Sequence, residues 1–203
     1  MANKLGAFIF MLFFSFAAFS QKVILNVSME NKVSKPTNDT IYYNINRPIT
    51  WDDFKGTPDY NNPGGAITAS GFAFDANMNT VGNDIYLNVG IYTFFSKRKS
   101  WKKPNINSNY HLSHEQHHFD ITRISAEKFL NEILRANFTV NNYNKLLSSL
   151  FTKAFDENTA LQQKYDSETR HSINTSEQLK WNDKIEREIK GVINNRYSAT
   201  GLR

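Results

Sequence analysis

The middle of the chain alternates between apolar and polar residues in a way that is typical of β-strands. From Asp84 to Ser96, alternate positions form one apolar face made of Ile85, Leu87, Val89, Ile91 and Phe95. Residues 66–75 are predicted to form a second strand and residues 77–83 a turn, so the two strands should pair as an antiparallel hairpin. Shorter strands are predicted at 22–27 and 41–45, followed by a single helical turn that Thr50 caps.

Three long helices are predicted in the second half of the chain, because apolar residues there recur at helical spacing. The first runs from Asn109 to Arg135 and the second from Tyr143 to Tyr165. A polar connection over 166–174 leads to the third helix, which begins with the capping-box pattern Thr175-Ser-Glu-Gln178. Residues predicted to face inward include Leu134, Phe155 and Leu179. Strands followed by helices indicate an α+β fold, with a small N-terminal antiparallel sheet and then three helices.

The first twenty residues have the pattern of a secretory signal peptide. Lys4 precedes an apolar run from Leu5 to Phe19, and Ala18-Phe19-Ser20 supplies small residues at the positions that a signal peptidase reads. The run is short for a bilayer crossing, which needs about 20 residues. We therefore expect export to the periplasm or outside the cell, without a stable membrane anchor after cleavage. The expected organisation is a signal peptide at 1–20, a polar lead-in at 21–40, one domain at 41–193 and a polar tail at 194–203.

Composition narrows the chemistry that the chain can carry. The 203 residues include no cysteine, so disulfides and thiolate ligands are excluded and a metal ion would have to be held by histidine and carboxylate. The net charge of +5 becomes +4 (5 − 1) once Lys4 is removed with the signal peptide. Part of this excess lies in the basic run at 97–103. No nucleic-acid motif accompanies it, so we expect a solvated loop and no nucleic-acid partner. The sequence does not indicate an oligomeric state.

Four of the five histidines fall within residues 111–118, at the start of the first predicted helix. Here His114-Glu-Gln-His-His118 fits the pattern H-E-x-x-H. Residues four apart lie on one face of a helix, so His114 and His118 can present two imidazole nitrogens to one metal ion. Glu115 can then reach a water molecule on that ion and act as general base. This arrangement is typical of zinc hydrolases that act on peptide bonds. His111 and His117 are interpreted as neighbours rather than ligands.

The third protein ligand has to come from elsewhere in the chain. His171 is the favoured candidate, because imidazole is a good zinc ligand and this residue stands alone in the polar connection. A glutamate, Glu157 or Glu168, is an alternative, and Asp166 is a ligand or a hydrogen-bond partner of one. Asp120 is expected to support the ligand histidines, and Tyr165 is a candidate donor to the oxyanion that forms during peptide hydrolysis.

Several separated motifs together resemble a bacterial family described as predicted secreted zinc-dependent proteases, with a domain of unknown function numbered 922. The similarity extends from about Ile49 to Ile189. Its motifs are Trp51-Asp-Asp-Phe54, Ser100-Trp101, His114-Glu-Gln-His-His-Phe-Asp-Ile121, Leu161-Gln-Gln-Lys-Tyr-Asp-Ser-Glu-Thr-Arg-His171 and Gln178-Leu-Lys-Trp-Asn-Asp-Lys-Ile185.

The resemblance implies a zincin-like metallopeptidase of the cell envelope. It places His114, Glu115 and His118 at the matching positions, and it favours Asp166, Thr169 and His171 as site residues. The chain departs from the family pattern at His117 and at Ser172, where glycine is expected.

The sequence thus predicts a secreted or periplasmic peptidase that uses Zn²⁺ and acts on proteins or peptides. The alternative is a zinc-binding envelope or scaffold protein without catalytic activity. A structural or adhesive surface protein, whose histidines have no role, is a third reading. Glu115 favours the peptidase, because a site that only binds zinc has no need of a base next to the ligands.

Overall fold

Strand β5 (Asp84–Ser96) lies at the centre of a four-stranded sheet within the part of the chain that the structure describes. The structure is a computed structural model that describes residues 22–30, 32 and 38–200, so the predicted signal peptide lies outside the described residues. The five positions of the predicted apolar face of β5 are all buried, from 0% to 4% exposed. The alternating pattern therefore identified this strand and its inner face correctly.

One edge of β5 is shared by two strands of opposite direction. Strand β1 (Val23–Met29) pairs with the first part of β5 in parallel, with Val23 opposite Ile85. Strand β2 (Thr40–Tyr42) pairs antiparallel with the end of β5, with Ile41 opposite Phe95. The sheet is thus mixed, and the prediction of a purely antiparallel sheet is wrong. The parallel strand lies in the polar lead-in, where a short strand was predicted at 22–27.

The other edge of β5 pairs along its whole length with β4 (Ser70–Val81). The predicted turn over 77–83 is wrong except at its end. Strand β4 continues to Val81, and a two-residue turn at Gly82 and Asn83 leads into β5. Gly82 adopts φ +63°, which glycine tolerates best in tight hairpin turns. Residues 75–81 are exposed, so this end of the strand needs no apolar pattern. The predicted strand at 66–75 is also divided, since Ala66–Ile67 form the short strand β3, which pairs with β6 (Trp101–Lys102).

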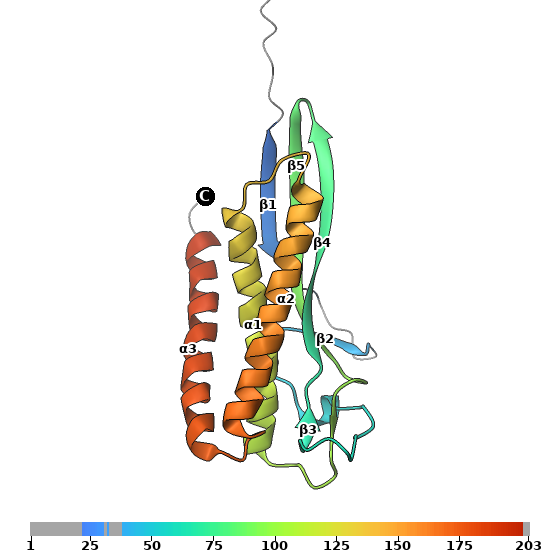
Figure 1. Ribbon diagram of the computed structural model, residues 1–203, viewed down its shortest axis with the longest axis vertical. Helices are drawn as coiled ribbons and strands as arrows, with labels where there is room; N and C mark the ends of the chain where they lie inside the picture. The colour runs from blue at the N-terminus through green and yellow to red at the C-terminus, as the bar shows by residue number, and fades with distance from the viewer. Residues whose placement is uncertain (1–21, 31, 33–37, 201–203) are drawn as a thin grey trace, which may run out of the picture.

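Three long helices follow the strands. Helix α1 (Asn109–Arg135) has the predicted bounds, α2 (Tyr143–Thr169) is one turn longer than predicted, and α3 (Thr175–Thr200) continues into the expected polar tail. Figure 1 shows them side by side against the sheet, with α3 farthest from the strands. Helix α1 contacts the sheet, α2 and α3. None of the described helices is both long and apolar enough to span a membrane.

Two of the three clusters of buried side chains among the described residues join the sheet to the helices and the helices to one another. Between the sheet and the helices, Phe129 and Ile133 of α1 pack with Phe72 of β4 and with the inner face of β5. Among the helices, the apolar residues of α1 pack with Tyr165 and with Trp181, Ile185 and Ile189 of α3. Three residues predicted to face inward are exposed instead, which corrects the prediction: Leu134 (56%), Phe155 (49%) and Leu179 (64%). On α3 the buried face begins one position earlier, at Gln178, and this rotates Leu179 into solvent.

Candidate metal centre

The first turns of α1 bring His114, Glu115 and His118 into the interior. The Ser108 hydroxyl accepts a hydrogen bond from the backbone N–H of His111 at 3.2 Å and caps the helix, so the motif begins inside regular helix. The three residues are 3%, 5% and 8% exposed. The two imidazole rings lie 4.9 Å apart, as expected for positions i and i+4 on one helical face.

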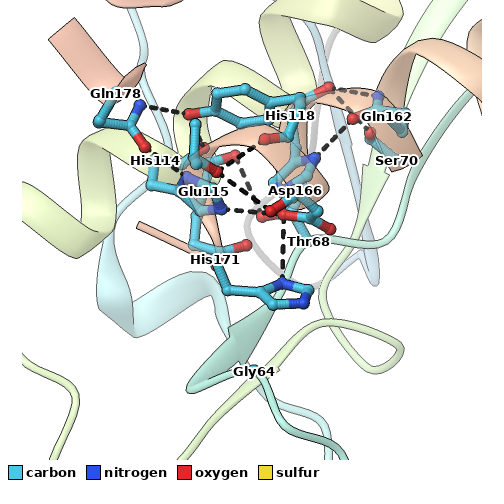
Figure 2. Close-up of polar contacts among 12 residues, drawn as sticks. Gly64, Thr68, Ser70, His114, Glu115, His118, Gln162, Asp166, His171 and Gln178 are labelled. Atoms are coloured by element: carbon cyan, nitrogen blue, oxygen red, sulfur yellow. Dashed lines mark hydrogen bonds and ion pairs between the residues drawn. The ribbon is translucent and has the colours of Figure 1, made fainter. Parts of the chain in front are cut away.

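Helix α2 supplies a carboxylate between these two imidazoles. Asp166 Oδ1 lies 3.1 Å from His114 Nε2 and 3.1 Å from His118 Nε2 (Figure 2). One ligand atom from each of the three residues lies within 4.8 Å of the other two, so the group could hold a metal ion. Asp166 reaches this position because α2 runs to Thr169. The polar connection that we predicted from residue 166 therefore begins four residues later than expected.

Two glutamine side chains orient the histidines through the ring nitrogens that face away from Asp166. Gln178 Oε1 lies 2.8 Å from His114 Nδ1, and Gln162 Oε1 lies 2.5 Å from His118 Nδ1. The Gln162 amide nitrogen donates to the His118 carbonyl and the Gln178 amide nitrogen donates to Asn182 Oδ1, which leaves each Oε1 to accept. An accepting oxygen places a ring proton on Nδ1, so Nε2 is the nitrogen of each ring that faces Asp166 and that could bind a metal ion.

The role of these glutamines was not predicted from the sequence, although the spacing between Gln162 and Asp166 could have indicated that they lie near each other. Gln162 and Asp166 are four residues apart on α2, so they share a face of that helix. Gln178 occupies the last position of the predicted capping box, where its side chain would be expected to bond the backbone near Thr175. It is 2% exposed and turns towards His114 instead.

Glu115 lies next to the ligand group with one carboxylate oxygen free. Its Oε2 is buried and has no hydrogen-bond partner in the described part of the chain. The Thr68 hydroxyl donates to the Glu115 carbonyl at 3.1 Å, which ties this turn of α1 to the segment between β3 and β4. A buried carboxylate oxygen without a partner is costly for folding, so it indicates a site where a proton or a water molecule is expected to be bound.

His171 lies on the outer side of Asp166 and is not one of the three grouped residues. Its Nδ1 is 3.3 Å from Asp166 Oδ1, and its side chain is 38% exposed. The residue stands in a turn in which Arg170, His171 and Ser172 have φ values of 50°, 52° and 70°. Such a run is unusual for residues other than glycine. Ser172, at the position where glycine was expected, thus adopts a conformation that glycine tolerates more readily.

The remaining candidate residues support the helices rather than the ligand group. Asp120 accepts hydrogen bonds from Tyr43 and Gln116, each at 2.8 Å, and its Oδ2 lies 3.1 Å from His117 Nδ1, so it does not orient His114 or His118 as expected. Glu168 accepts a hydrogen bond from Trp181 Nε1 at 2.8 Å and is thereby directed towards α3. The last two candidate site residues, Thr169 and Tyr165, are both fully buried. The Thr169 hydroxyl donates to the Tyr165 carbonyl at 2.7 Å.

Tyr165 packs against the back of the site. Its ring stacks on His114 with a centroid distance of 4.6 Å, and its hydroxyl accepts a hydrogen bond from the Gln178 amide at 2.6 Å. Burial raises the pKa of Tyr165 far above its usual value, so its hydroxyl stays protonated. The residue therefore steadies His114 and Gln178, and this position differs from the one expected for an oxyanion donor.

The charges of the ligand group are coupled. Burial lowers the pKa of His118, but the hydrogen bond and charge of Asp166, together with the charge of Glu115, outweigh this effect and raise the pKa to about 9. Burial favours the neutral form of Asp166, but hydrogen bonds from the two histidines hold the pKa of its carboxyl well below the usual range. In the metal-free protein the group thus holds a proton that a metal ion would displace.

A cleft of about 580 Å³ opens onto Glu115 and Asp166. Ala66 of β3 forms part of one wall and the turn containing His171 forms another. Strand β5 comes just before α1 in the chain, but it is paired along both edges and offers no free edge to an extended peptide. The strand at the cleft is β3. Comparison with protein-family models, curated proteins and solved structures finds no match to this chain.

Proposed function

We propose that the chain is a zinc-dependent peptidase of the secreted family that its motifs resemble, with a zincin-like arrangement of the metal helix. The observation that carries the proposal is the convergence of His114, His118 and Asp166 beside Glu115, where a cleft opens onto Glu115 and Asp166. Neutral imidazole and carboxylate are the donors that catalytic zinc sites use, and a chain without cysteine offers no thiolate alternative.

In this proposal His114, His118 and Asp166 hold the ion, and the ligand role that we first gave to His171 passes to Asp166. A bound zinc ion acts as a Lewis acid and lowers the pKa of water from 15.7 to about 7. Gln162 and Gln178 keep the two imidazoles in the orientation and tautomer that ligation requires. His171 contacts the outer side of Asp166 and limits the freedom of its carboxylate.

Glu115 is the general base. The residue lines the cleft and its Oε2 has no partner within the described residues, so the carboxylate can accept a proton from the attacking water and later deliver it to the leaving amine. Burial keeps competing water away from the carboxylate and strengthens its interaction with the reacting groups. Export to the periplasm or the outside of the cell, which residues 1–20 suggest, would bring this activity to envelope or extracellular proteins.

The experiment compares the purified chain with its Glu115→Gln variant for zinc content and for hydrolysis of an unfolded protein substrate. We expect about one zinc per chain in both proteins, and a loss of turnover of about 10²- to 10⁴-fold in the variant. Fewer than about one zinc per ten chains would contradict the metal site. Zinc without turnover in the parent protein would instead support the non-catalytic zinc-binding protein.

A further inference from the structure

The cleft beside the metal centre gathers basic residues from three parts of the fold. His111 stands one turn before Glu115 on α1, Arg170 and His171 come from the turn after α2, and Lys103 comes from the segment after β6. Glu115 and Asp166 are the acidic residues among those that line the cleft, and both belong to the candidate metal centre. The part of the cleft outside the metal centre is therefore positively charged.

The two permanent cations are not neutralised by the protein itself. The Arg170 guanidinium makes no hydrogen bond or ion pair with the described part of the chain. The Lys103 ammonium donates to the carbonyl of Asn62 at 2.7 Å, and this neutral acceptor holds the group in place while its charge remains. Two further N–H bonds of the ammonium stay available for a ligand.

Arg170 also has an ordinary structural explanation, because a cation near the C-terminus of a helix stabilises the helix dipole. Its backbone N–H caps α2 by bonding the carbonyls of Asp166 and Ser167. The residue, however, also lines the cleft. The residue lies within three consecutive left-handed positions, and strained backbone of this kind tends to persist where function requires a side chain in a fixed place.

Apolar residues line part of the rest of the cleft, together with the polar residues Asn105, Ser167 and Ser172. Gly65 allows Ile106 to pack closely there, since a Cβ at Gly65 would lie 2.8 Å from the Ile106 side chain. Ile173, which is 73% exposed, stands next to the cationic turn. A cleft that combines a buried acid, an apolar wall and unneutralised cations suits a peptide that carries a negative charge close to the bond being cut.

We infer that the cleft recognises a carboxylate of its peptide substrate through Arg170, with Lys103 as a second contact. The inference rests on the proposed peptidase function and names the substrate class of that site. A guanidinium binds a carboxylate with two parallel hydrogen bonds, which gives both affinity and orientation. The carboxylate belongs either to the C-terminus of the peptide or to an aspartate or glutamate side chain, and the same chemistry serves both.

Binding of peptide pools to zinc-loaded Glu115→Gln protein tests the inference without cleavage. The probes are hexapeptides that carry a neutral fluorophore and whose randomised positions exclude Asp and Glu. One pair differs only in a free or an amidated C-terminus, and a second, amidated pair differs only in Glu or Gln at a central position. We expect the charged member of at least one pair to bind about tenfold more tightly, as a charge-assisted contact provides. The pair that shows the preference identifies the source of the carboxylate.

Adding Arg170→Gln should remove most of the preference for the charged member. The matched control is Arg135→Gln, which removes an exposed arginine at the far end of α1, about 30 Å along the helix from His114. This control should leave the preference unchanged. Equal binding within both pairs, absence of binding by every pool, or a preference that survives Arg170→Gln would each overturn the inference.

The same pools separate this inference from the proposed function when the parent protein is assayed for cleavage. Selective binding without cleavage would retain the carboxylate site and refute the peptidase. Cleavage of the charged and neutral pools at equal rates would retain the peptidase and refute the carboxylate site.

Discussion

Replacing Asp166 with asparagine tests whether this residue is the third metal ligand. The carboxylate oxygen lies 3.1 Å from the Nε2 atoms of both His114 and His118 and 3.3 Å from His171 Nδ1. Asparagine keeps the size and shape of the side chain and removes its charge. The variant should therefore fold normally and bind zinc less tightly.

The size of the effect depends on pH. Structural zinc sites with four ligands bind with about 10–16 kcal/mol, so one ligand contributes on the order of 3 kcal/mol, or about a hundredfold in Kd. Proton competition acts in the opposite direction. His118 has a pKa of about 9 in the metal-free protein, largely because of Asp166. Displacing its proton at pH 7 therefore costs the parent protein about 3 kcal/mol.

The variant lacks the charge that raises the pKa of His118, so this cost falls when Asp166 becomes asparagine. At pH 7 the two effects nearly cancel, and zinc affinity should decrease only slightly. At pH 9 about half of the parent protein has already lost this proton, so its displacement costs little in either protein and a weakening approaching a hundredfold should appear. The parent protein should accordingly gain about tenfold in zinc affinity per pH unit between pH 7 and 9.

The measurement is a competition titration of zinc against a chromophoric chelator at pH 7, 8 and 9. His171→Ala serves as the matched control and should stay within about threefold of the parent protein at each pH, because a residue outside the ligand set has only an indirect effect. If His171→Ala weakens binding about a hundredfold while Asp166→Asn leaves it unchanged at pH 9, the ligand assignment is wrong. The set predicted first from the sequence would then be restored.

Three further perturbations follow from the contacts of the site and the core. Gln178→Leu removes the acceptor of His114 Nδ1 and should weaken zinc binding by about 10- to 100-fold in the same titration. Phe129→Ala, at a fully buried position, should lower the free energy of unfolding in urea by about 3–5 kcal/mol, whereas Leu134→Ala, at an exposed position, should change it by less than about 1 kcal/mol. In the metal-free protein the raised pKa of His118 should contribute up to about 3 kcal/mol of stability below pH 6.5. This contribution is lost as pH rises to 9, and unfolding curves at pH 6 and 9 measure it.

Features that depend on neighbouring residues could be predicted from the sequence. The alternation from Asp84 to Ser96 identifies β5 and its buried face, because successive side chains of a strand point to opposite sides. The bounds of α1 follow from its apolar spacing, and the regular geometry of a helix brings His114 and His118 onto one face. The helical turn at Trp51–Asp53 and its capping by Thr50 were also predicted correctly, since Thr50 bonds Asp53 three residues away.

Features that depend on how distant segments pack could not be predicted in this way. Local pattern shows that a helix has an apolar face, but the rotation of that face is decided by its neighbours, and Leu134 is exposed for this reason. The parallel pairing of β1 with β5 joins residues 62 apart, a separation over which periodicity carries no information.

The same limit applies to the metal centre. Sequence alone determined that two imidazoles and an acid lie together on one turn of α1, because the covalent chain and helical geometry require it. Which carboxylate meets them depends on the length and rotation of α2, which brings Asp166 to His118 across 48 residues and leaves His171 on the outer side. Packing of α1 against α2 and α3 also brings Gln162 and Gln178 to the two histidines. Buried polar side chains need hydrogen-bond partners, and the neighbouring helices provide them for His114 and His118.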